Sequence, residues 1–258
     1  MSGPRTAARL CRLFAVLALG AILAGCFASG ARVGLRIPLE RRQRWTQAFL
    51  RRLARTLPFE VRVIGELPSR PMLWVSNHVS WTDIPLLGRL TPLSFLSKAE
   101  VRDWPLAGWL AKNAGTLFIR RGGDSQRVRR QIIERLGQSR PLLIFPEGTT
   151  TDGSGVRAFH GRLLGAAIDA GTPVQPVAIQ YLRHGCLDPV APFIGEDDLV
   201  SHLLRLFAQP PGEVVIRLLE PLASTGKTRA ALAFEARQAI LQALSGDEQA
   251  TRRQPCAA

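Results

Sequence analysis

The sequence predicts an α/β protein with a mixed, largely parallel sheet flanked by helices, and three observations support this class. The chain has 258 residues, of which 46% are hydrophobic, so it is long enough for one sizeable domain with its own core. After Pro58, short apolar runs rich in β-branched residues alternate with longer segments of helical period. No segment of the chain repeats another, which speaks against a solenoid.

Each apolar run is expected to form a strand, and each periodic segment a covering helix. The strands are expected at residues 60–66, 71–76, 93–98, 115–120, 142–146, 174–181 and 213–220. The helices are expected at about 81–90, 104–113, 124–139, 159–170, 196–208 and 228–244. The polar sequence from Gly246 onward lacks apolar period and is expected to be disordered.

The positive charge of the chain is concentrated at its N-terminal end. Residues 1–57 contain eleven arginines and one glutamate, a formal charge of +10 out of +14 for the whole chain. The body is therefore nearly balanced, and it has no recognisable nucleic-acid-binding module. A basic and apolar N-terminus indicates membrane lipid as the partner, and no nucleic acid is expected.

Two segments of this N-terminal region are expected to form a membrane anchor. Residues 13–31 are an uncharged run of 19 residues, about the length that crosses a hydrocarbon core of roughly 30 Å. After it, Trp45, Phe49 and Leu53 recur on one helical face, and most of the neighbouring arginines lie opposite. Such a helix lies on the membrane surface, where each nearby basic residue contributes about 1 kcal/mol. The expected organisation is an anchor at 1–57, a folded body at 58–245 and a disordered tail at 246–258.

The apolar run has more than one possible topology. It can span the membrane with its N-terminus outside, or dip in and return, and residues 23–26 also resemble a lipoprotein cleavage site. Arginines flank the run on both sides, and so dense a basic segment resists export. We therefore expect an inner-membrane protein whose body lies on the cytoplasmic face.

A histidine and an aspartate follow the second expected strand, in the sequence SNHVSWTDIP. His78 is expected at the carboxyl end of the strand and Asp83 in the next helical turn, within reach of the imidazole. A carboxylate on one ring nitrogen fixes the tautomer and leaves the other nitrogen free to accept a proton. The residues also have a plainer interpretation, because Ser80 and Asp83 match a helix capping box. The pair alone leaves both interpretations open.

Polar residues also follow two other expected strands. One strand ends in Arg120 and Arg121 before a glycine pair, and two guanidiniums there suit bidentate capture of a phosphate. Another is followed by Glu147 and Gly148 in FPEGTTTDGSG, where backbone amides could point at an anion or oxyanion. A solvated strand end and an ordinary turn would contain the same kinds of residues.

Several reaction types are disfavoured by what the sequence lacks. Residues 226–228 read GKT, but Pro221 stands where a P-loop requires glycine. There is no G-x-S-x-G elbow, and no cysteine or lysine near His78 to act as a covalent nucleophile. The four cysteines are scattered without metal-ligand spacing, so no metal site is expected. His78 therefore has only the substrate to activate.

Together the motifs resemble the four sequence blocks of the glycerolipid acyltransferases, the lysophosphatidic acid acyltransferase family. NHVSWTD resembles the N-H-x4-D block, GTLFIRR the G-x-x-F-[IV]-x-R block and FPEGTT the F-P-E-G-T block. VQPVAIQY is similar to the fourth block, a strand containing V-x-P-V. All four stand in the family's order within residues 74–181, and their conjunction is far more specific than any one of them.

The resemblance implies a reaction and a role for each matching residue. It makes His78 the general base and Asp83 its partner. His78 would take the proton from the free hydroxyl of a lysolipid as that oxygen attacks the thioester of acyl-CoA or acyl-carrier protein. Transfer would be direct, with no metal and no cofactor beyond this thioester co-substrate. Substrate binding would fall to Asn77, Lys98, Gly115, Phe118, Arg120, Arg121, Glu147, Gly148, Thr149 and Thr150.

One departure from the family pattern bears on the acceptor. Where the family commonly has E-G-T-R, this chain has Thr150, so the arginine expected at the acceptor phosphate is absent unless Arg120 or Arg157 replaces it. Relatives that acylate lyso-ornithine lipid resemble this chain in having EGTT. Arg120 and Arg121 nevertheless favour 1-acyl-sn-glycerol 3-phosphate, with phosphatidic acid as product. The alternatives are lyso-ornithine lipid as acceptor and, in a different class, a non-catalytic lipid-binding protein of the membrane surface.

Overall fold

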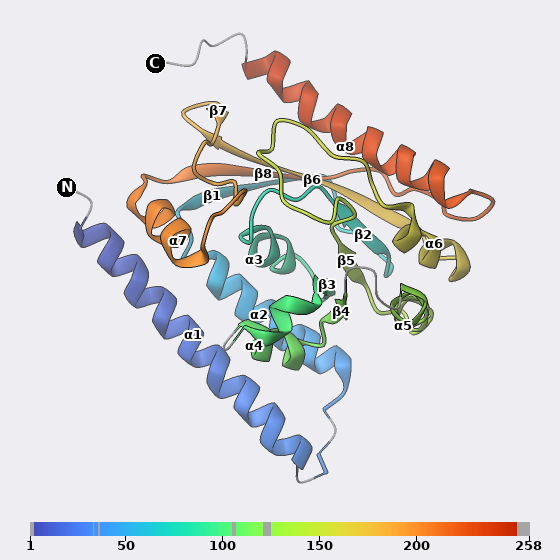
Figure 1. Cartoon of the computed structure of the whole chain (residues 1–258), viewed down its shortest axis with the longest axis horizontal. Helices are drawn as coiled ribbons and strands as arrows, with labels where there is room; N and C mark the ends of the chain where they lie inside the picture. Colours follow the sequence, from blue (N-terminus) through green and yellow to red (C-terminus); the bar gives the residue numbers. More distant parts are fainter. Residues whose placement is uncertain (1–2, 33, 36, 105–106, 121–124, 252–258) are drawn as a thin grey trace.

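An eight-stranded sheet forms the centre of the part of the chain that the structure describes, in the order β1-β8-β6-β2-β5-β3-β4 with β7 beside β6 (Figure 1). The structure is a computed structural model that describes residues 3–32, 34–35, 37–104, 107–120 and 125–251. The strands are β1 (Phe59–Ile64), β2 (Leu73–Ser76), β3 (Ser94–Lys98), β4 (Leu117–Ile119), β5 (Leu142–Ile144), β6 (Val174–Arg183), β7 (Cys186–Leu187) and β8 (Gly212–Leu218). Strand β6 runs antiparallel to β7 and β8, and the other pairs are parallel, which confirms the predicted class.

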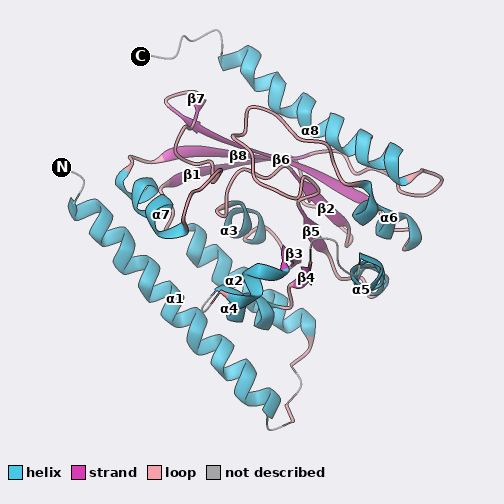
Figure 2. Ribbon diagram, in the orientation of Figure 1, coloured by secondary structure: helices cyan, strands magenta, loops and turns pink. Residues whose placement is uncertain are grey.

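Helices surround this sheet, as Figure 2 shows. They are α1 (Gly3–Arg32), α2 (Leu39–Ala54), α3 (Asp83–Gly88), α4 (Ala107–Ala114), α5 (Ser125–Gly137), α6 (Gly161–Asp169), α7 (Leu199–Ala208) and α8 (Arg229–Thr251), with a 3₁₀ helix η1 at Ala99–Asp103. Each strand expected from the sequence is present, and β7 and η1 are additions to the expected set. The tail expected from Gly246 is helical as far as Thr251, because the sequence there, although polar, contains helix formers and no proline.

The two faces of the sheet carry separate apolar cores. Successive side chains of a strand point to opposite faces, so Trp74 faces one core while Leu73 and Val75 face the other. Helices α2, α3 and α7 cover the first face, and α5, α6 and α8 cover the second. Because β2 is buried on both faces, the loop that follows it starts from a rigid position in the middle of the sheet.

Helix α2 contributes directly to the first core. Leu50 and Ala54, together with Leu57 just after the helix, are buried in the same apolar cluster as Trp74. The amide of Gln43 also donates to the hydroxyl of Ser94 in β3, at 3.0 Å. The boundary expected after residue 57 therefore divides segments that share one core.

Helix α1 contacts α7 near its start and α2 near its end. Near its start, Arg9 donates to the backbone carbonyls of Phe207 and Gln209 at the end of α7, each at 2.6 Å. Near its end, the ring of Phe27 stacks on Trp45 of α2, with centroids 4.6 Å apart. Among the described residues, α1 is the one helix long and apolar enough to cross a membrane.

Candidate active site

The imidazole of His78 and the carboxylate of Asp83 are hydrogen-bonded at the carboxyl end of β2. Nδ1 of His78 lies 2.7 Å from Oδ2 of Asp83, which is the first residue of α3. Because an ionised carboxylate can only accept, the hydrogen lies on Nδ1, and Nε2 is the nitrogen that can take up a proton. The Asp83 side chain is fully buried, whereas 19% of the His78 side chain is exposed. The pair therefore presents an imidazole to the surface and keeps its carboxylate inside.

Asp83 also shapes the turn between β2 and α3. Its Oδ2 accepts hydrogen bonds from the backbone N–H of Val79 at 2.8 Å and of Ser80 at 3.0 Å. These bonds hold the turn that precedes α3. Among the described residues the Ser80 hydroxyl has no hydrogen-bond partner and Thr82 is the N-cap, so the reciprocal half of the predicted capping box is absent. One carboxylate therefore holds both the turn and the imidazole.

The turn after β5 holds the backbone of His78 from both sides. Oε1 of Glu147 accepts from the N–H of His78 at 2.8 Å, and the N–H of Thr151 donates to the His78 carbonyl, also at 2.8 Å. The other carboxylate oxygen, Oε2, accepts from the N–H of Arg157 at 2.8 Å. Burial raises the pKa of Glu147, although these N–H groups act in the opposite direction. The side chain of Glu147 thus holds the main chain of His78 in place.

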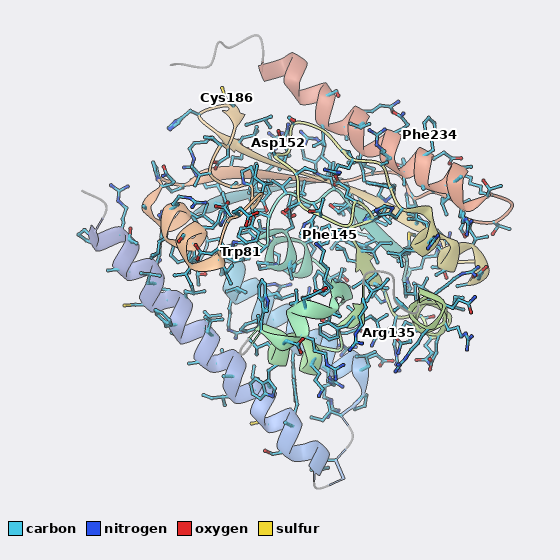
Figure 3. The ribbon with its side chains drawn as sticks, viewed as in Figure 1. Trp81, Arg135, Phe145, Asp152, Cys186 and Phe234 are labelled. Carbon is cyan, nitrogen blue, oxygen red and sulfur yellow. The ribbon has the colours of Figure 1, made fainter. Side chains whose placement is uncertain are left out.

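An aromatic ring fixes the plane of the imidazole. Phe145, the residue after β5, stacks on His78 with ring centroids 3.9 Å apart and an angle of 12° between the planes. Figure 3 labels Phe145 in the centre of the molecule, between the helices of the two faces. With Nδ1 bound to Asp83 and one ring face covered, the imidazole is restricted to one orientation.

The third sequence block brings its small and hydroxyl residues to the same place. Gly148 has a φ of +71°, a conformation that favours glycine, and the imidazole of His160 lies 3.4 Å from where a Cβ would stand. Thr149 is half-buried beside it. The hydroxyl of Thr150 donates to the carbonyl of Phe193, whose N–H in turn donates to Val79 at 2.9 Å. Position 150 therefore connects the third block to the loop before α7.

Asn77 is used inside the protein. Its side-chain amide donates to the carbonyl of Ile179 in β6 and accepts from the N–H of the same residue, each at 2.9 Å. The residue has no exposed surface. The structure therefore gives Asn77, expected among the substrate-binding residues, the function of joining the catalytic turn to β6.

The residues of the second block lie farther along the same edge of the sheet. Lys98 ends β3, Phe118 lies in β4 beside β3, and Arg120 follows β4 with its side chain exposed. Strands β5 and β3 separate β4 from β2, which at about 4.8 Å per strand places Arg120 roughly 14 Å from the His78 turn. Gly115 packs under α2, because a Cβ there would stand 2.6 Å from Leu39. Arg121 lies outside the described residues.

Four residues near the pair were not singled out from the sequence. Phe145 and His160 contact the histidine turn and the glycine turn, as described above. The hydroxyl of Tyr181 donates to Oδ1 of Asp83 at 2.5 Å, and the hydroxyl of Thr82 lies 2.7 Å from that of Tyr181. The available signal was that Phe145 and Tyr181 belong to the third and fourth sequence blocks and Thr82 to the first.

Comparisons with known proteins agree with this arrangement. A family model described as Acyltransferase matches residues 58–180. A lyso-ornithine lipid O-acyltransferase from Pseudomonas aeruginosa is 57% identical over 95% of this chain and 96% of its own length. A protein of the same name from Brucella abortus is 37% identical over 74% of this chain and 78% of its own length.

The fold has a counterpart among solved structures. The crystal structure of the 1-acyl-sn-glycerophosphate acyltransferase from Thermotoga maritima covers both chains completely, with a TM-score of 0.70 and 22% identity. This likeness shows the shared fold. With a histidine and an aspartate paired at the carboxyl end of β2, and one relative 57% identical over 95% of the chain, the chain belongs to the acyltransferase family.

Proposed function

We propose that this protein is a lyso-ornithine lipid O-acyltransferase that uses acyl-CoA or acyl-carrier protein as donor. The single observation that carries the chemistry is the hydrogen bond between Nδ1 of His78 and the buried carboxylate of Asp83. The names of the relatives from Pseudomonas aeruginosa and Brucella abortus support the acceptor.

The geometry supports a direct transfer with His78 as general base. Nε2 of His78 takes the proton from the acceptor hydroxyl as its oxygen attacks the carbonyl carbon of the thioester. The carbon–sulfur bond then breaks, and the proton passes from the imidazole to the leaving thiolate. Asp83 stabilises the imidazolium that exists between these two proton transfers. The ester and the free thiol are the products, and no acyl-enzyme forms.

The acceptor assignment depends on position 150. The sequence favoured 1-acyl-sn-glycerol 3-phosphate because of Arg120 and Arg121, but the relatives support the alternative better. Thr150 has its hydroxyl bound to Phe193, so it forms part of a wall and offers no guanidinium to a phosphate. An ornithine headgroup bears an ammonium and a carboxylate instead of a phosphate, and does not require that arginine.

We also propose that the protein binds to the cytoplasmic face of the membrane. Arg9 of α1 contacts α7 and Phe27 contacts α2, which packs in the core of the body, and the two contacts are about 27 Å apart along the helix, a distance similar to the hydrocarbon thickness. A helix held at both points cannot cross the bilayer while the body stays in water. Phe14 and Ile22 are each 64% exposed between those points, which supports a helix lying in one leaflet.

Two acceptors offered to one enzyme preparation test this function. The purified protein is given lyso-ornithine lipid and lysophosphatidate separately, with the same labelled acyl thioester, and kcat/KM is compared. We expect lyso-ornithine lipid to be preferred, and His78→Ala to remove the roughly 10²–10⁴-fold that a positioned general base contributes. A preference for lysophosphatidate contradicts the acceptor. Near-normal transfer by a folded His78→Ala variant contradicts the general base, whereas absence of transfer by the wild type with every acceptor favours a lipid-binding protein.

A further inference from the structure

The two oxygens of the Asp83 carboxylate have partners from different parts of the fold. Oδ2 accepts from His78, Val79 and Ser80, which all belong to the same turn as Asp83 itself. Oδ1 accepts from the hydroxyl of Tyr181 at 2.5 Å, and Tyr181 lies in β6. The Tyr181 bond therefore ties this carboxylate to the sheet.

Thr82 completes this arrangement. Because a carboxylate only accepts, the hydroxyl hydrogen of Tyr181 points to Asp83, and the hydroxyl of Thr82 donates to the Tyr181 oxygen at 2.7 Å. Thr82 and Asp83 are fully buried and Tyr181 is 3% exposed, so bulk water has little access to these atoms. The bonds form a continuous sequence from Thr82 through Tyr181 and Asp83 to the imidazole of His78.

The Tyr181 hydroxyl is held as a donor. Burial, and secondly the charge of Asp83, raise the pKa of Tyr181 well above its ordinary value. The ring is fixed as well, because it meets Phe59 of β1 edge to face, with centroids 5.2 Å apart. Burial and packing thus favour the protonated hydroxyl and hold the ring in place.

We propose that Tyr181, supported by Thr82, is a positioning residue for the His78–Asp83 pair: it fixes the orientation of the carboxylate and stabilises the charge on the oxygen that His78 does not use. This role rests on the proposed acyl transfer, in which His78 is the base. Tyr181 touches neither the imidazole nor the thioester, so its effect on the reaction passes through Asp83.

Removing the Tyr181 hydroxyl has a defined chemical consequence. Oδ1 would be left without its donor in a buried place, and the negative charge would either take up a proton or concentrate on Oδ2. In the first case Asp83 no longer orients the imidazole, and in the second it holds His78 protonated more strongly. Both changes keep the pair out of its active form until the pH is higher. Of the other titratable groups, Glu147 faces the His78–Asp83 pair and Asp188 faces Tyr181.

Kinetics of Tyr181→Phe give the first test. We expect kcat at neutral pH to fall by about 10- to 100-fold with little change in either KM, since the lost bond is one to a charged group. The acid limb of kcat/KM against pH should move to higher pH, so that part of the loss is recovered in alkaline buffer. Loss of packing alone would leave that limb in place. An unshifted limb with near-normal kcat overturns the proposal.

A double-variant comparison separates a role through Asp83 from a general effect on the fold. In an Asp83→Asn background, Tyr181→Phe should cost less than about twofold, because residues that act as a unit are not additive. A loss as large as in the wild-type background overturns the proposal. Should Tyr181→Phe fail to fold, Thr82→Val is the second variant, and Thr82→Ser, which keeps the hydroxyl, should restore activity and the acid limb.

A measurement without substrate distinguishes this inference from the proposed function. The chain contains one tyrosine, so ¹³C labelling at tyrosine Cζ yields a single signal that reports the Tyr181 hydroxyl. That signal should shift in Asp83→Asn and in Thr82→Val, and stay unchanged in His160→Ala. An unchanged ¹³C chemical shift in Asp83→Asn contradicts the proposed role of Tyr181. Absence of acyl transfer by the wild type contradicts the proposed function. If the wild type is active and depends on His78 but Tyr181→Phe has a normal kcat, only this inference is contradicted.

Discussion

Glu147 shows how a buried carboxylate can serve the site without facing the substrate. Each of its oxygens accepts one backbone N–H, from His78 and from Arg157, and 4% of the residue is exposed. Burial raises the pKa of Glu147 above its ordinary value of 4.5. The side chain therefore supplies acceptors to two backbone N–H groups in a buried place where water solvates its negative charge poorly.

Replacing Glu147 by glutamine tests this arrangement, because an amide accepts at only one of its two ends. In Glu147→Gln one of the two backbone N–H groups would face an NH₂ donor, at a cost of about 1–3 kcal/mol of unfolding free energy. We also expect a lower kcat, since the His78 backbone loses its support. Thermal unfolding and steady-state kinetics check the two effects. An equal free energy of unfolding for the wild type and Glu147→Gln would contradict the role of these two hydrogen bonds.

The same variant should change how stability depends on pH. Folded Glu147 binds its proton at a higher pH than an unfolded glutamate, so this group adds stability as pH falls toward 4.5 and loses it as pH rises through the folded-state pKa. Glutamine does not titrate. The advantage of the wild type over Glu147→Gln should therefore widen from about pH 7 to about pH 5. A gap that narrows over this range contradicts the raised pKa.

At the residue scale, the sequence predicted contacts that are close along the chain and missed those that depend on the sheet. His78 and Asp83 are five residues apart, and a strand followed by a helical turn brings them together. Tyr181 reaches Asp83 only because β6 is the neighbour of β2, a pairing that no local pattern specifies. The partner of the Asn77 amide was missed for the same reason, since it lies in β6.

At the scale of elements, α7 is joined to the catalytic turn by a buried histidine. The indole N–H of Trp81 donates to Nδ1 of His202 at 3.0 Å, and Nε2 of His202 lies 3.0 Å from the carbonyl of Pro192. Figure 3 shows Trp81 beside α7. Both bonds require a neutral imidazole with its hydrogen on Nε2. Burial lowers the pKa of His202, which keeps the ring in that form.

This connection predicts a pH-dependent stability. Unfolded histidine takes up a proton near pH 6.5, whereas folded His202 resists it, so its contribution is present above pH 6.5 and is lost as pH falls through the folded-state pKa. His202→Gln can make both bonds without titrating and should lose less stability between about pH 8 and about pH 5.5. His202→Leu leaves both partners unsatisfied and should cost about 1–3 kcal/mol. Melting curves at the two pH values decide; a glutamine variant as pH-sensitive as the wild type contradicts the assignment.

Hydrophobic period predicted the elements better than their ends. The strands and helices of the body lie where the sequence placed them, because most of them bury the apolar residues that give the period, although β1 has no fully buried residue. Strand β7 has two residues and η1 five, too few for a period to be seen. The end of α8 was placed too early, since the sequence after Leu244 is polar and has no apolar repeat to mark a helix.

At the scale of the whole molecule, the exposed apolar surface of α1 is on the opposite side of the sheet from α8. Helix α1 packs with α2 and α7 on the first face, whereas α8 covers the second (Figure 1). Phe14 of α1 is 64% exposed and Phe234 of α8 is 61% exposed. The two phenylalanines are matched in exposure and differ in the side of the molecule they occupy, so they form a natural pair for testing the membrane face.

Substitution of this pair tests the proposed seat on lipid. Phe14→Asp should weaken partition onto vesicles containing anionic lipid by at least about tenfold, because it removes a large apolar side chain from the interface and adds a negative charge. Phe234→Asp should bind as the wild type does. Deleting residues 1–57 is a poorer test, since α2 is part of the core. Equal loss in both variants, or in neither, contradicts the assignment of the face.

The position of β1 at the edge of the sheet has a consequence for the order of synthesis. Its partner is β8, which is made about 150 residues later, so at about 5–20 residues per second β1 waits roughly 8–30 s. During that interval α1 and α2 have left the ribosome, while α7 and the finished sheet that cover them do not yet exist. On the proposed membrane-bound protein, the lipid surface would therefore cover the apolar residues of α1 during the interval in which their partners in the fold are not yet made.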